Sequence, residues 1–180
     1  WSSDVCSSDL AKQDTSIITL DNQTNFLINQ VAVNCVEQLI HLAIEKEIDL
    51  GMDEQHDTPI HSQEFAVHSI MYNLIDNAIK YTPAGGVINV STYSQDDQAF
   101  IVIEDSGPGI PPELYDQILK RFYRVHQHLE VGSGLGLSIV DKATQRLGGN
   151  LSFGKSEQLG GLQVTIQLPM NDHPTLVPHT

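Results

Sequence analysis

The sequence is poor in cysteine, in basic residues and in long apolar runs, and each shortage counts against one class of protein. Two cysteines in 180 residues, Cys6 and Cys35, are too few for a disulfide framework and fit a reducing compartment. No run approaches the roughly 18 apolar residues that a membrane-spanning helix needs. Nine lysines and arginines against 23 acidic residues give a formal net charge of −14, which makes nucleic acid a poor partner.

The remaining composition is typical of one folded domain. With 40% hydrophobic and 18% charged residues, the chain resembles neither a disordered tail nor a membrane protein, and its length suits one domain better than two. The charge is uneven, because residues 1–79 hold 13 acids and 2 bases whereas residues 80–180 hold 10 acids and 7 bases. We therefore expect an anionic ligand to find its cations in the second part.

The two ends of the chain differ from the middle. Residues 1–10 (WSSDVCSSDL) have no amphipathic period and no signal-peptide layout, so we expect a non-native scar or adapter-derived segment. Residues 171–180 contain two prolines and predict a disordered tail. The predicted domain therefore covers residues 11–170.

Hydrophobic periodicity predicts a few long helices and two hairpins, a grouping that favours a two-layer α+β sandwich. The first helix is expected to be capped by Asp21, Asn22 or Thr24 and to continue to about Lys46. The other predicted helices cover residues 62–81, 112–122 and 135–147, and the predicted strands cover residues 17–20, 47–52, 58–61, 87–94, 98–105, 150–154 and 162–168.

Three polar residues form a ridge on the 62–81 helix. Asn73, Asn77 and Lys80 follow at i, i+4 and i+7, with Tyr81 beside them, so they share one helix face. Carboxamide oxygens suit Mg²⁺, and an ammonium group can neutralise a phosphate. The alternative is a solvated helix face, and the ridge alone does not distinguish the two.

Asp105 ends a predicted strand and precedes the loop 106–110 (SGPGI). A carboxylate at a sheet edge can accept a hydrogen bond from the 6-amino group of adenine, and the glycines let backbone approach a ligand closely. A plain turn is the alternative interpretation.

A glycine-rich segment over residues 132–138 (GSGLGLS) opens the last predicted helix, where free N–H groups favour phosphate. It lacks the Lys-Ser or Lys-Thr of a Walker A loop, and it fits a dinucleotide fingerprint poorly. Lys120, Arg121 and Arg124 precede it and could close on a triphosphate. Two pairs of histidines, His126 with His128 and His56 with His61, lack Cys or carboxylate ligands at matching spacing and are expected at the surface.

Four segments in this order resemble the catalytic ATP-binding domain (HATPase_c, GHKL superfamily) of bacterial two-component sensor histidine kinases. They are Asn73–Thr82, Asp105–Ile110, Arg121–Arg124 and Gly132–Val140, and the resemblance extends from about residue 17 to Pro169. It implies a mixed, mostly antiparallel sheet packed on about three helices, with ATP and Mg²⁺ as the cofactors.

The resemblance also implies a role for each matching residue. Asn77, with Asn73, holds Mg²⁺; Lys80 contacts a phosphate; Tyr81 packs at the nucleotide; and Asp105 binds the adenine amino group. The remaining expected nucleotide contacts are Gly107, Gly109, Ile110, Phe122, Arg124, Gly132, Gly134, Leu135, Gly136, Leu137 and Thr165.

One departure stands at the last glycine motif. Family members commonly continue Gly-Thr-x-Phe, whereas Gly160-Gly161 is followed here by Leu162-Gln163-Val164. A hydroxyl and an aromatic wall are therefore missing from that end of the expected pocket.

By the same resemblance the chain binds Mg-ATP and donates the γ-phosphate to a histidine on a separate dimerisation domain. No H-E-x-R-T-P-like segment is present, so this fragment alone is not expected to phosphorylate itself. Its implied partners are that domain and a response regulator, with the fragment monomeric and the parent a membrane-anchored homodimer whose catalytic part is cytoplasmic. A degenerate interaction module and an anti-sigma-type Ser/Thr kinase remain as alternatives.

Overall fold

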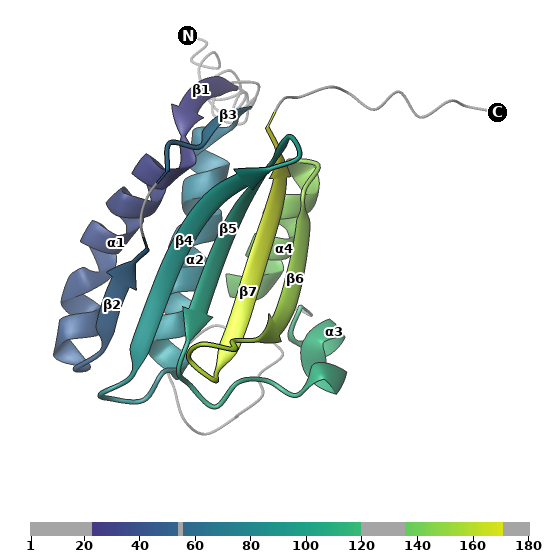
Figure 1. Cartoon of the computed structure of the whole chain (residues 1–180). Helices are drawn as coiled ribbons and strands as arrows, with labels where there is room; N and C mark the ends of the chain where they lie inside the picture. The colour runs from purple at the N-terminus through teal and green to yellow at the C-terminus, as the bar shows by residue number, and fades with distance from the viewer. Residues whose placement is uncertain (1–22, 54–55, 120–135, 171–180) are drawn as a thin grey trace, which may run out of the picture.

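In the computed structural model, which describes residues 23–53, 56–119 and 136–170, three helices pack on one face of a five-stranded sheet (Figure 1). The helices are α1 (Ile28–Glu45), α2 (Glu64–Tyr81) and α4 (Gly136–Arg146), and a single turn each of 3₁₀ and α-helix follows in η1 (Pro112–Leu114) and α3 (Tyr115–Ile118). The predicted two-layer α+β class is confirmed.

The sheet is mixed and mostly antiparallel, with the strand order β2-β4-β5-β7-β6. Only the β2–β4 pair is parallel among these neighbours. The strands are β2 (Asp49–Met52), β4 (Val87–Gln95), β5 (Gln98–Asp105), β6 (Asn150–Lys155) and β7 (Leu162–Pro169). A separate antiparallel pair, β1 (Thr24–Leu27) and β3 (Pro59–Ser62), lies beside the start of α1 (Figure 1).

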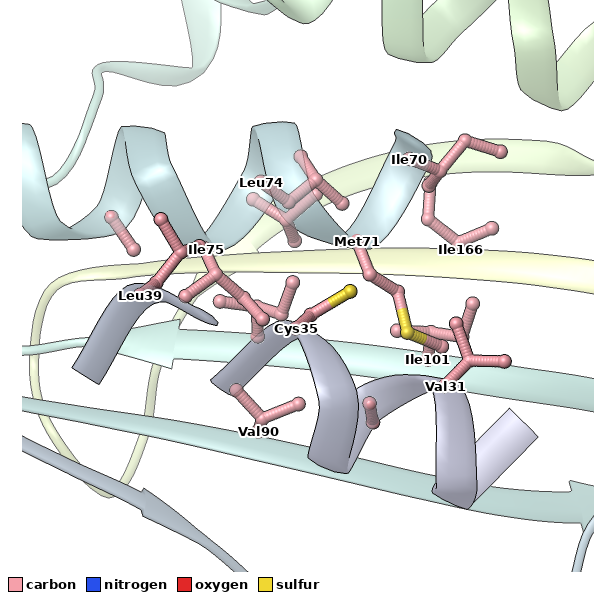
Figure 2. Packing of buried hydrophobic residues seen from close by; sticks show 14 of the residues in the cluster. Val31, Cys35, Leu39, Ile70, Met71, Leu74, Ile75, Val90, Ile101 and Ile166 are labelled. Carbon is pink, nitrogen blue, oxygen red and sulfur yellow. The ribbon is translucent and has the colours of Figure 1, made fainter. Parts of the chain in front are cut away.

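The core lies between the helices and the sheet. Apolar residues of α1 and α2 recur at spacings of three and four, and they meet the inward-facing residues of β4, β5 and β7. Figure 2 shows Cys35 of α1 directed toward α2, where its Sγ lies 3.7 Å from His68 O, and Met71 of α2 extending toward Ile101 of β5. Burial raises the pKa of the Cys35 thiol to about 12, so Cys35 packs in the core as a small apolar residue.

The beginning of α1 differs from the prediction. Thr24 lies in β1 and not at a helix cap, and the helix begins at Ile28, whose N–H donates to Thr58 O at 3.0 Å. The reason is that β1 pairs with β3, where the partner of Thr24 is Ser62, and local spacing does not reveal a pairing with so distant a segment. The other proposed caps, Asp21 and Asn22, lie outside the described residues.

The remaining boundaries agree with the predictions to within a few residues. Of the helix expected over residues 112–122, the described part consists of the short turns η1 and α3. The predicted strand 17–20, the segment 1–10 and the tail 171–180 lie outside the described residues.

Candidate functional site

A pocket opens where the C-terminal half of α2 meets the end of β5, the start of β7 and the start of α4. Its walls are mostly apolar, and they carry the Asp105 carboxylate and the Asn77 carboxamide. An apolar slot with a few fixed polar groups is the usual form of a small-molecule site. The lining residues are Leu74, Asn77, Ala78, Tyr81, Ile103, Asp105, Pro108, Gly109, Ile110, Ile118, Leu137, Leu162 and Val164.

Asp105 is the most constrained polar group of the pocket. Strand alternation in β5 turns it to the helix side of the sheet, where it is 7% exposed. Its Oδ1 accepts the N–H of Gly107 at 2.8 Å and that of Leu162 at 3.1 Å. No described residue donates to Oδ2, so this oxygen is left for a ligand.

Burial also changes the pKa of this carboxyl. Desolvation raises the pKa of Asp105 above its ordinary value of 3.8, and the hydrogen bonds from Leu162 and Gly107 partly oppose the rise. The two N–H donors favour the charged form that a base amino group needs as its acceptor.

Glycine at position 161 allows this arrangement. The Gly161 N–H donates to Asp105 O at 3.0 Å. A Cβ at residue 161 would overlap both the backbone oxygen and the Oδ1 of Asp105, and one at Gly107 would lie 2.9 Å from the same Oδ1. Gly109 has a φ of +69°, which side chains rarely adopt. The loop and the Gly160-Gly161 segment thus close around one carboxylate.

The two asparagines of the ridge lie against the start of α4. Asn73 Nδ2 donates to Ser69 O at 2.7 Å, which directs its amide nitrogen toward its own helix. A Cβ built at Gly136 would lie 3.1 Å from Asn77 Nδ2 and 3.6 Å from Asn73 Oδ1. Carboxamide oxygens and a helix N-terminus therefore come together beside the pocket, a combination that suits a hydrated cation and a phosphate.

Lys80 and Thr165 do not belong to the pocket lining. Lys80 forms an ion pair with Asp76, one turn earlier on α2, and it is not among the pocket-lining residues. Thr165 lies between the buried Val164 and Ile166 of β7, so strand alternation turns it to the other face of the sheet. The structure brings neither side chain into the pocket.

Of the other expected contacts, Asn77, Tyr81, Asp105, Gly109, Ile110 and Leu137 line the pocket, and Asn73, Gly107 and Gly136 border them. The sequence motifs do not predict the apolar walls of the pocket or the hydrogen bond from the Leu162 amide to Asp105. The apolar spacing of α2 and the alternating apolar residues of β5 and β7 are sequence signals for the apolar pocket walls. No local pattern indicates the contact of the Leu162 amide. Phe122, Arg124, Gly132, Gly134 and Leu135 lie outside the described residues.

A buried carboxylate lies at the end of an apolar slot, and two carboxamides lie beside the start of α4. The chain belongs to the family of histidine kinase-, DNA gyrase B- and HSP90-like ATPases, whose pattern matches residues 62–172. Within this family the domain is of the histidine kinase type.

The similar proteins include sensor kinases and their catalytic domains. The swarming motility regulation sensor protein RssA of Serratia marcescens is 33% identical over 141 residues, which cover 78% of this chain and 30% of that protein. The structure of the mycobacterial sensor histidine kinase MprB is 28% identical, with a TM-score of 0.69, and covers 82% of this chain and 97% of that one. The catalytic domain of histidine kinase ThkA, 24% identical, has the same fold, with a TM-score of 0.74 and coverage of 82% and 95%.

The chain spans about a third of the length of the curated relatives that it matches. Among the described residues, no helix is long and apolar enough to cross a membrane.

Proposed function

We propose that this domain binds Mg-ATP with its base against Asp105 and its phosphates toward the start of α4. The observation that carries the proposal is the fixed carboxylate: two backbone N–H groups occupy Oδ1, and Oδ2 is left at the pocket. The adenine 6-amino group is a donor of the right kind for that oxygen. The apolar walls suit the two faces of a purine ring.

The phosphate end rests on the ridge of α2. The side-chain oxygens of Asn73 and Asn77 suit a Mg²⁺ ion that is shared with phosphate oxygens, because Mg²⁺ prefers hard oxygen ligands and keeps several waters. The helix dipole at the start of α4 favours the negative charge of the phosphates. When bound, the ion neutralises phosphate charge during phosphoryl transfer.

In this proposal the γ-phosphate is accepted by a histidine on a separate dimerisation domain. That histidine then passes the phosphoryl group to a response regulator. The support is the family match and the names of the relatives, which include the sensor histidine kinase RppB of Synechocystis. Asn73 also lacks a proton-accepting group, so it is poorly suited to activate water for hydrolysis. The parent protein is then an ATP-dependent, dimeric sensor whose catalytic part lies in the cytoplasm.

Two measurements test this function. Calorimetric titration of the folded chain with ATP in excess Mg²⁺ is expected to give saturable binding. Labelled ATP mixed with the chain and with the histidine-bearing segment of the same parent protein is expected to label that segment at an acid-labile site. Absence of binding heat contradicts the nucleotide site, and binding without labelled histidine contradicts the transfer step.

A further inference from the structure

A tight turn joins β6 to β7 beside the base end of the pocket, and one serine holds it together. Ser156 is fully buried and directly follows β6. Its Oγ donates to Glu104 Oε1 at 2.8 Å and accepts the N–H of Leu159 at 2.9 Å. Its own N–H donates to Gly161 O at 2.9 Å, and its carbonyl oxygen accepts the N–H of Gly160 at 3.0 Å.

Glu104, the partner of this serine, is itself an unusual residue. It is a carboxylate with 9% exposure, and it immediately precedes Asp105 in β5. Burying a charged group is costly unless it is hydrogen-bonded, and Ser156 Oγ supplies one donor. Because consecutive strand residues point to opposite faces, Glu104 and Asp105 hold the same turn from the two sides of the sheet.

The turn also supplies a donor to the base-binding carboxylate. Gly161 N–H donates to Asp105 O at 3.0 Å, and Leu162 N–H donates to Asp105 Oδ1 at 3.1 Å. The position of the Leu162 amide therefore depends on where the turn is held. A shift of this amide leaves Oδ1 with the Gly107 N–H as its one remaining donor, so the carboxylate is held less firmly.

We propose that Ser156 and Glu104 are positioning residues for base recognition: they fix the turn so that the Leu162 amide occupies Oδ1 and only Oδ2 faces the adenine amino group. This inference rests on the proposed ATP site. Neither residue lines the pocket, so both act through Asp105 and not by touching the nucleotide.

The test compares two ligands that differ only in the 6-amino group of the purine ring. ATP and purine riboside triphosphate share ring, ribose and phosphates, and only ATP carries the 6-amino group. The dissociation constant of purine riboside triphosphate divided by that of ATP, both measured by calorimetry in excess Mg²⁺, therefore isolates the amino-group contact, and this ratio falls when the contact is lost. Ser156→Ala is expected to weaken ATP binding about 3- to 10-fold and purine riboside triphosphate binding less than about twofold.

Three further variants separate positioning from general stability. Glu104→Ala removes the acceptor and leaves Ser156, so it is expected to lower the ratio as Ser156→Ala does. Glu104→Gln keeps an acceptor oxygen for Ser156 Oγ and is expected to restore the ratio. Ser152→Ala changes an exposed serine of the same strand and is the matched control, expected to keep the wild-type ratio. Thermal melting confirms that each variant is folded.

The outcomes distinguish this inference from the function on which it rests. A wild-type chain that binds neither ligand, or both equally, overturns the proposed base site itself. A wild-type chain that prefers ATP, together with folded alanine variants that keep this preference, overturns the positioning role alone. If Ser156→Ala does not fold, Glu104→Ala decides by the same criterion.

Discussion

The two ends of the pocket differ in the groups that form them: backbone N–H groups at one end and helix side chains at the other. At the base end, backbone N–H groups of Gly107 and Leu162 hold one carboxylate, and Gly161 is packed so closely that no Cβ fits. At the end proposed for the phosphates, the polar side chains of Asn73 and Asn77 are carried by a single helix, and Asn73 donates to Ser69 O of that same helix.

The difference has a physical consequence. Backbone donors are fixed by the sheet and its turns, so the base end is arranged before a ligand binds and loses little entropy on binding. Side chains on a helix surface can exchange their local partners for a ligand or an ion. We therefore expect changes at the base end to disrupt the site itself, and changes at the phosphate end to weaken mainly the metal and phosphate contacts.

Gly161→Ala is the change with the largest expected effect. The added methyl group overlaps the backbone oxygen and the Oδ1 of Asp105, so the turn must move and the carboxylate must reorient. We expect ATP affinity to fall about 100-fold or more, and the free energy of unfolding to fall by about 1–3 kcal/mol. Calorimetry and urea denaturation measure the two quantities.

The matched control for this change is Gly154→Ala on β6. A Cβ at that position meets no atom within 4 Å, so ATP affinity is expected to stay at the wild-type level. Unchanged ATP binding by Gly161→Ala would show that the close packing at Asp105 has no part in the site.

Asp105→Asn is expected to have the next largest effect. The carboxamide keeps one acceptor oxygen, which the Gly107 and Leu162 N–H groups occupy, and its nitrogen then faces the pocket. The carboxamide NH₂ of this variant then faces the adenine amino group, and two donors cannot form a hydrogen bond with each other. ATP affinity is therefore expected to fall about 10- to 100-fold. Asp97→Asn, at an exposed turn with a φ of +58° that asparagine tolerates, is the control. Equal affinities of the two variants would contradict the role of Asp105.

Asn77→Ala tests the phosphate end. It removes the carboxamide that lies against Gly136 and lines the pocket. ATP affinity in excess Mg²⁺ is expected to fall about tenfold, whereas affinity in EDTA changes little, because the lost contact is to the ion. Asn89→Ala on β4 is the control. An equal loss with and without Mg²⁺ would show that Asn77 contacts the nucleotide and not the metal.

The smallest expected effect concerns stability and pH. The folded-state pKa of Asp105 is raised, so the folded chain holds this proton more tightly than the unfolded chain does. The resulting stabilisation is fully present below pH 3.8 and is lost as the pH rises through the raised pKa. At neutral pH, Asp105→Asn is therefore expected to unfold at higher urea concentration than the wild type.

Urea denaturation between pH 3.5 and about 7 measures this difference. The advantage of Asp105→Asn is expected to shrink as the pH falls and to vanish near the ordinary carboxyl pKa. A variant that is less stable than the wild type at neutral pH would mean that the hydrogen bonds to the charged carboxylate outweigh its desolvation.

The periodicity of apolar and polar residues in the sequence predicts where several residues of this site lie. The 3.6-residue spacing put Asn73 and Asn77 on one face of α2, and Asp105 was expected at the end of a strand beside a glycine loop. These are local features, because each depends only on where a residue falls within its own helix or strand. For the same reason the elements themselves were found with small errors at their ends.

Contacts between distant segments could not be predicted in this way. The Leu162 amide reaches Asp105 across 57 positions, and the β1–β3 pairing replaced the expected cap at Thr24. The ion pair of Lys80 with Asp76 is different, because it is a local contact that the i, i+4 spacing indicates.

The most direct test of the account is hydrogen exchange of the Gly107, Gly161 and Leu162 amides in the nucleotide-free chain, followed by NMR. If the base end is arranged before ligand binding, these three amides are protected to the same degree as amides in the middle of β5. Exchange at the rate of exposed amides until ATP is added would contradict the account, because the carboxylate would then be ordered by the ligand and not by the fold.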